Sequence, residues 1–114
     1  MVIKKFADLE NLPVTGEGVD KVTRRVVLGA EDGAPNFTMR CFTVAPGGFT
    51  FYHTHDYEHE LFILSGSGVA RGVNSEVSIE RDEAILVMPN EWHQFINNGQ
   101  EPLVFLCIIP NQPQ

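Results

Sequence analysis

The chain has 114 residues, of which 43% are hydrophobic and 20% are charged, and this composition excludes an intrinsically disordered protein. We interpret residues 1–114 as one domain, because a chain of this size can bury a core without disulfides or a structural metal. The 8 Lys and Arg against 15 Asp and Glu give a net charge of −7 at pH 7. That charge argues against a nucleic acid or an anionic membrane as a partner, since both attract concentrated positive charge.

Two features of the sequence predict a cytoplasmic protein. After the N-terminal lysines there is no apolar stretch of signal-peptide length, and no run approaches the roughly 20 apolar residues of a membrane span. Cys41 and Cys107 each lie in an apolar, strand-like segment. Without an export signal, two reduced thiols are favoured over a disulfide.

Short β-branched and aromatic runs separated by turn residues dominate the chain and predict an all-β sandwich or barrel. Residues 4–12 favour about one turn of helix before Pro13 ends it. We expect residues 1–20 to form an N-terminal extension and residues 110–114 a loose tail. The predicted strands are residues 22–28, 37–45, 49–55, 59–64, 69–72, 77–80, 84–88, 93–97 and 103–109.

The histidines are the most informative side chains. Three of the four, His53, His55 and His59, fall within seven residues. On a strand, His53 and His55 point to the same face. His59 follows a short loop, so its ring can return to the same place. His93 follows a turn at the start of another predicted strand. Several neutral imidazoles that converge on one point favour a divalent transition metal, although a set of exposed loop histidines is the alternative.

Two motifs in this region resemble those of the cupin family. Gly47-x5-His53-x-His55-x3-His59-x6-Gly66 is similar to the first cupin motif, G-x5-H-x-H-x3,4-E-x6-G. Asp82-x5-Met88-Pro89-Asn90-x2-His93-x3-Asn97 is similar to the second, G-x5-P-x-G-x2-H-x3-N. The resemblance implies a single-domain cupin barrel, which is a double-stranded β-helix or jelly roll.

The second motif departs from the family pattern at three positions. Asp82 and Asn90 stand where glycines are usual, and Met88 stands in place of the proline. Asp and Asn tolerate the left-handed backbone conformation better than other non-glycine residues, so we expect both turns to survive.

His59 occupies the place where most cupins carry a metal-binding glutamate, and Glu60 is the next residue. The spacing to Gly66 counts from residue 59, and strand alternation sends the two side chains to opposite faces. The chain therefore resembles small cupins that bind a divalent metal through four histidines, here His53, His55, His59 and His93, with Glu60 outside the metal's ligands. Mn or Fe(II) is the favoured working ion, and Zn or Ni are plausible occupants of purified protein.

Strand parity and the resemblance together predict the pocket wall. Phe51 shares a face with His53 and His55, and Phe95 shares one with His93. By resemblance to the four-histidine cupins, Phe105 and Cys107 point inward. Cys107 is expected to be a buried, inert thiol, and a reactive thiol of low pKa is the alternative. Arg40 is a charged residue within an otherwise apolar strand. We interpret it either as an anchor for an anionic substrate or as a solvated strand residue. Trp92 and Phe42 are expected in the core or at an interface.

The resemblance implies a metal-dependent oxidoreductase of the dioxygenase kind that acts on a small organic, anionic molecule. Four imidazoles leave the charge of the metal uncompensated, and a six-coordinate ion keeps two positions open. The alternatives are a cupin isomerase or lyase and a protein that binds a metal or ligand without catalysis, since one fold hosts many reactions. No catalytic residue is assigned. We also expect a homodimer, formed when residues 22–28 add to the edge of a partner's sheet.

Overall fold

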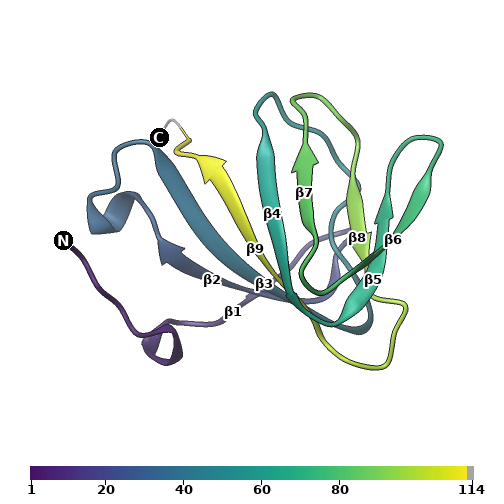
Figure 1. Cartoon of the computed structure of the whole chain (residues 1–114), viewed down its shortest axis with the longest axis horizontal. Helices are drawn as coiled ribbons and strands as arrows, with labels where there is room; N and C mark the ends of the chain where they lie inside the picture. The colour runs from purple at the N-terminus through teal and green to yellow at the C-terminus, as the bar shows by residue number, and fades with distance from the viewer. Residues whose placement is uncertain (113–114) are drawn as a thin grey trace.

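The computed structural model describes residues 1–112, and strands make up most of it (Figure 1). The expected all-β architecture with almost no helix is confirmed. Within this part of the chain, no helix is long and apolar enough to cross a membrane. The elements in order are η1 (Phe6–Asp8), β1 (Leu12–Val14), β2 (Asp20–Leu28), η2 (Ala30–Asp32), β3 (Phe37–Phe49), β4 (His59–Ser65), β5 (Ser67–Arg71), β6 (Glu76–Glu80), β7 (Ala84–Val87), β8 (Gln94–Ile96) and β9 (Leu103–Pro110).

All nine strands belong to one antiparallel sheet that curls over on itself (Figure 1). The main path runs β6-β5-β8-β3-β9-β4-β7, and β2 pairs with both β3 and β1 beside it. The curl brings β5, β6 and β8 to one end of the molecule and β1 and β2 to the other. The inner face of this curled sheet holds the core.

Strand β3 connects the two ends of the sheet. Its first eight residues pair with β9, and its last residue, Phe49, pairs with Ile96 of β8. Gly47 allows the change of direction with a positive φ of 84°. A Cβ on Gly48 would lie 2.6 Å from the carbonyl oxygen of Asp20, so only glycine lets β2 cross this closely. The sequence predicted one strand that ends at residue 45 and another that begins at residue 49. In the structure, the chain between them belongs to β3 and bends within that strand.

The predicted strand over residues 49–55 does not form. The chain leaves the sheet after Phe49 and makes only an isolated bridge between His53 and His93. The reason is that β8, the neighbour on that side, has only three residues and pairs mainly with β5. The segment that carries the first two histidines is thus an extended loop.

The core follows the period of two expected for a half-buried sheet. Along β9, buried and half-buried residues alternate, and Leu103, Phe105, Cys107 and Ile109 point inward. The remaining core residues come from strands on both sides of the curl: Val22, Val44, Leu61, Ile63, Ile79, Val87 and Phe95.

Two of the unusual turn residues behave as the sequence predicts. Asp82 and Asn90 adopt φ values of 71° and 65°, which is the left-handed conformation that glycine has in the family motif. The predicted tolerance of both turns is confirmed.

The two ends of the chain differ from expectation. The predicted N-terminal extension contributes β1, which pairs with Val22–Arg24 of β2, and its helical part is the single turn η1. At the other end, Pro110 still belongs to β9, and the Asn111 side chain donates to the Ala34 carbonyl. The loose tail predicted from residue 110 is therefore wrong for Pro110 and Asn111, and residues 113–114 lie outside the described residues.

Candidate metal centre

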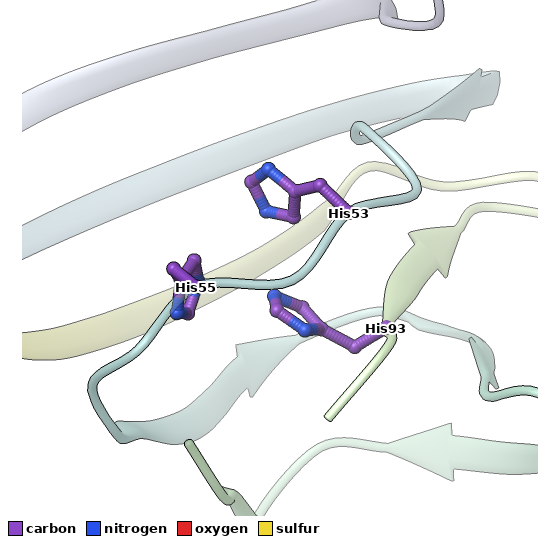
Figure 2. Close-up of side chains that lie close together, drawn as sticks. All are labelled: His53, His55 and His93. Atoms are coloured by element: carbon purple, nitrogen blue, oxygen red, sulfur yellow. The ribbon is translucent and has the colours of Figure 1, made fainter. Parts of the chain in front are cut away.

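Backbone pairing brings the first two histidine segments together. The amide of His53 donates to the carbonyl of His93 at 3.2 Å, and the amide of His93 donates back to His53 at 3.1 Å. His55 lies two residues further along the same extended segment, so its ring returns to the same side. Figure 2 shows the three imidazoles facing one another, two from the loop after β3 and one from the segment before β8.

His53, His55 and His93 form a compact ligand group. One ring nitrogen of each lies within 4.8 Å of the others. Their ring centroids are 4.9–5.2 Å apart: His53 to His55 at 5.2 Å, and His93 to each of the other two at 4.9 Å. Such a group of nitrogen donors suits Zn, Cu, Ni, Fe or Mn rather than a hard cation such as Ca²⁺.

Hydrogen bonds determine which nitrogen two of these rings present. Nδ1 of His55 lies 3.0 Å from the Tyr57 carbonyl, and Nδ1 of His93 lies 2.8 Å from the Glu91 carbonyl. Because a carbonyl only accepts, each Nδ1 must carry the proton and each Nε2 must keep its lone pair. Both Nε2 atoms are buried without a hydrogen-bond partner among the described residues. This is the arrangement of metal-binding imidazoles, so the residues fit a metal ion.

His59 lies beside this group at the start of β4. Its side chain is buried, and its ring centroid is 4.0 Å from that of His55 and 5.1 Å from that of His93. Its Nε2 is also buried without a partner in residues 1–112, whereas its Nδ1 lies 3.5 Å from Cys107 Sγ. Glu60 is exposed on the other face of β4, as strand alternation predicts.

The pKa values of His53, His59 and His93 are lowered, which keeps these three imidazoles neutral near pH 7. Burial, together with the neighbouring histidines and Arg40, lowers the pKa of His59 to about 3. The same causes lower the pKa of the more exposed His53 to about 4. Burial also lowers the pKa of His93, against the opposing effect of its hydrogen bond to the Glu91 carbonyl. Neutral imidazole is the form that binds a metal.

A cavity of about 280 Å³ opens onto the histidines. All four histidines line it, and so do the five residues that the sequence placed in the pocket wall. Those five are Arg40, Phe51, Phe95, Phe105 and Cys107. The structure thus brings the whole predicted set to one place.

The cavity also includes residues that the sequence analysis did not select. Arg24 and Tyr57 line it, and so does Phe42, which was expected in the core or at an interface. Phe42 stacks on Phe105 with a centroid distance of 5.4 Å. Strand parity places Arg24 on the same face as Val22, but the register of β2 on β3 decides that this face points inward. Trp92 lies outside the cavity, exposed and stacked on Tyr52.

Arg40 and Cys107 lie directly behind His59. Nη2 of Arg40 donates to Cys107 Sγ at 3.2 Å, and the guanidinium sits 4.9 Å above the Phe42 ring. Burial raises the pKa of the Cys107 thiol, although the positive charge of Arg40 and its hydrogen bond act in the opposite direction. A thiol with a raised pKa is protonated near pH 7 and is a weak nucleophile.

Comparison with known proteins agrees with the observed fold. The sequence profile described as "Cupin domain" matches residues 40–109, which is more than half of the chain. The polyketide cyclase RemF from Streptomyces resistomycificus superposes with a TM-score of 0.92 at 28% identity, over 98% of this chain and 80% of that one. The predicted jelly-roll barrel is therefore confirmed.

Two curated proteins are similar in sequence. A 1-methylthio-D-xylulose 5-phosphate methylsulfurylase from Rhodospirillum rubrum is 36% identical over 77% of this chain. The tetracenomycin polyketide synthase protein TcmJ from Streptomyces glaucescens is 32% identical over 81% of this chain. The matched regions span only 55% and 63% of these relatives.

Proposed function

Because the chain belongs to the cupin family, we propose that it is a metal-dependent enzyme that acts on a small organic molecule. One observation carries this proposal: the Nε2 atoms of His55, His59 and His93 are buried beside a cavity without hydrogen-bond partners in the described chain. Buried polar atoms are nearly always paired, so three such atoms at one place favour a bound ion.

We propose four metal ligands, His53, His55, His59 and His93. The compact group contains the first, second and fourth of these, and the buried ring of His59 lies within 4.0 Å of His55. Mn or Fe(II) remains the proposed working ion. Zn or Ni would occupy the same nitrogen donors in purified protein, because nitrogen-rich sites prefer the later metals.

The residues around the centre indicate what kind of ligand the site favours. When bound, a divalent metal supplies Lewis acidity toward an oxygen atom of the ligand. Among residues 1–112, no Asp or Glu lines the cavity, so the protein offers no carboxylate base there. Two arginines and several aromatic rings line it instead. This wall favours a molecule that carries an acidic phenol or enol and needs little help to ionise.

The reaction we propose is an oxygenase-type oxidation of such a molecule. His53, His55, His59 and His93 would hold the metal, which would supply the redox chemistry toward dioxygen. The cavity also encloses the centre with Phe51, Phe95 and Phe105, which exclude water from that side.

A cyclisation or isomerisation without oxidation is the second candidate. It is supported by the 28% identity to a polyketide cyclase over nearly the whole chain. The similarity to a tetracenomycin polyketide synthase protein points to the same kind of substrate, a polyketide. Binding of a metal or ligand without catalysis remains the third possibility.

One experiment separates these three candidates. The protein is loaded with Fe(II), Mn or Zn, its metal content is measured, and oxygen uptake and product mass are followed with a panel of phenols and 1,3-diketones. We expect stoichiometric metal and oxygen uptake with the Fe(II) or Mn form only. A product of unchanged mass, formed with Zn as well, would support cyclisation or isomerisation. Bound metal without turnover would support a binding protein.

We further propose that the protein is a single cytoplasmic domain. One sheet includes every strand from β1 to β9, which supports a single folding unit. Cys41 and Cys107 are both buried free thiols, as expected in a reducing compartment.

A further inference from the structure

Two guanidinium groups share the inner face of paired strands. In the register of β2 and β3, Arg24 lies opposite Phe42, and Val26 lies opposite Arg40. Residues directly opposite each other, and residues two apart on one strand, point to the same face of a sheet. Arg24 and Arg40 are therefore diagonal neighbours, and both line the cavity that contains the histidines.

Neither arginine has a carboxylate partner in the part of the chain that the structure describes. The ion pairs found there are Lys4 with Asp32 and Arg81 with Asp82. Nε of Arg40 is buried without a hydrogen-bond partner. A half-buried guanidinium with a buried, unpaired donor is costly unless an anion compensates it, and no carboxylate among the described residues pairs with it.

The rest of the wall indicates the kind of anion. Phe42, Phe51, Phe95 and Phe105 line the same cavity, and Phe42 and Phe105 stack on each other. A cavity of about 280 Å³ suits a small ligand, because pockets for drug-sized molecules begin near ~300 Å³. Aromatic faces favour a flat, conjugated ring over a polyhydroxylated chain.

Arg40 also links this subsite to the histidines. Its Nη2 lies 3.2 Å from Cys107 Sγ, which lies 3.5 Å from Nδ1 of His59. The Cys107 thiol thus lies between the Arg40 guanidinium and the His59 ring. Both arginines and all four histidines line the same cavity, so one small molecule there can contact both groups.

We propose that Arg24 and Arg40 bind the carboxylate of a small aromatic acid whose ring hydroxyl points to the four histidines. The arginines and the aromatic rings alone support the carboxylate subsite. The second contact, of the hydroxyl with a metal, rests on the proposed function.

Isothermal titration calorimetry with matched probes tests this inference. The probes are 2-hydroxybenzoate and its uncharged analogue 2-hydroxybenzamide, titrated into the metal-free and the Zn-loaded protein. Because charge-assisted hydrogen bonds are the stronger kind, the carboxylate should bind at least about tenfold more tightly than the amide in both forms. Zn should tighten both probes, since both carry the hydroxyl.

Three variants test which residues cause the preference for the carboxylate over the amide. Arg40→Met keeps an unbranched stem against Phe42 and removes the charge, and Arg24→Gln removes the second charge. Each should abolish most of the preference for the carboxylate and leave the affinity of the amide nearly unchanged. Arg25→Gln is the matched control, because Arg25 points to the other face of β2 and contacts the carbonyls of Phe6 and Leu9.

Every outcome bears on the inference. Equal affinities of wild-type protein for the two probes, or an unchanged preference in both cavity variants, would overturn it. Tighter binding of ribose 5-phosphate than of 2-hydroxybenzoate would overturn the aromatic class. If the protein failed to bind Zn but kept an arginine-dependent carboxylate preference, the subsite would stand and the proposed function would fail.

Discussion

Three of the four imidazoles of the proposed centre have a partner on the other ring nitrogen. Backbone carbonyls of Tyr57 and Glu91 hold His55 and His93, and these partners do not depend on side-chain identity. His59 instead contacts the thiol of Cys107, which Arg40 also contacts. Among these ring partners, only the Cys107 thiol that contacts His59 is a side chain. Only the partner of His59 can therefore be altered by substitution.

Replacement of His59 by Ala should weaken metal binding by more than about 100-fold. Loss of an outer-sphere partner already costs about 10–100-fold in metal affinity, and a direct ligand should cost more. His59→Glu should retain a metal while lowering the net positive charge of the site. Competition with a chelator at pH 7 measures these affinities.

Glu60→Gln is the matched control for these variants. Glu60 is the next residue on β4 and is exposed on the opposite face, so its neutralisation should change metal affinity little. Loss of binding in Glu60→Gln with normal binding in His59→Ala would contradict the four-histidine proposal. The site would then be the ordinary cupin centre of three histidines and one glutamate.

At the scale of elements, a single buried side chain joins the segments that carry the site. The Asn97 amide donates to the carbonyls of Val44 and Glu101, and its oxygen accepts from the Gly99 amide. The backbone of Asn97 also pairs with Gly47 and Gly48. The bend of β3 and the end of β8 are thereby held together, which positions the loop from Thr50 to His55 beside His93.

Asn97→Ala should lower the free energy of unfolding by about 3 kcal/mol, because two carbonyls lose a buried donor. Asn98→Ala alters the adjacent exposed residue and should change it by no more than about 0.5 kcal/mol. Urea denaturation of the metal-free proteins measures both values. Equal stability of the two variants would show that the Asn97 network does not hold β3 and β8 together.

At the scale of the whole molecule, β2 leaves part of its outer edge open. β1 covers Val22–Arg24 of β2, so a partner can add only along residues 25–28. Val26 is 46% exposed on this stretch. The predicted interface is thus shorter than the sequence suggested, but it retains the unpaired backbone groups that attract a second strand.

We expect a homodimer in solution, paired along residues 25–28. Sedimentation at micromolar concentration should give about twice the chain mass of 12.7 kDa. Hydrogen exchange should show protection of amides in residues 25–28 that disappears on dilution, whereas β6, at the far end of the sheet, should be unaffected. A species of 12.7 kDa at that concentration would contradict the prediction.

Much of the fold and site follows from local patterns in the sequence. A continuous run of apolar and β-branched residues identifies β9, and strand parity with His93 gives the inward direction of Phe95. The spacing of His53, His55, His59 and His93 likewise places four imidazoles in one region. Asp82 and Asn90 indicate left-handed turns from their own conformational preferences.

Only the tertiary structure decided the features that depend on register and closure. His53 lies in a loop and not in a strand, because the short β8 offers it a single backbone pairing with His93. Arg24 and Phe42 face the cavity, and β1 forms from the expected extension, because β2 takes a particular register on β3. Register and curl arise from contacts between residues distant in sequence, so no local period encodes them. The sequence by itself determined most of the strands and the grouping of the histidines, and the closure of the sheet decided which arginines line the same cavity.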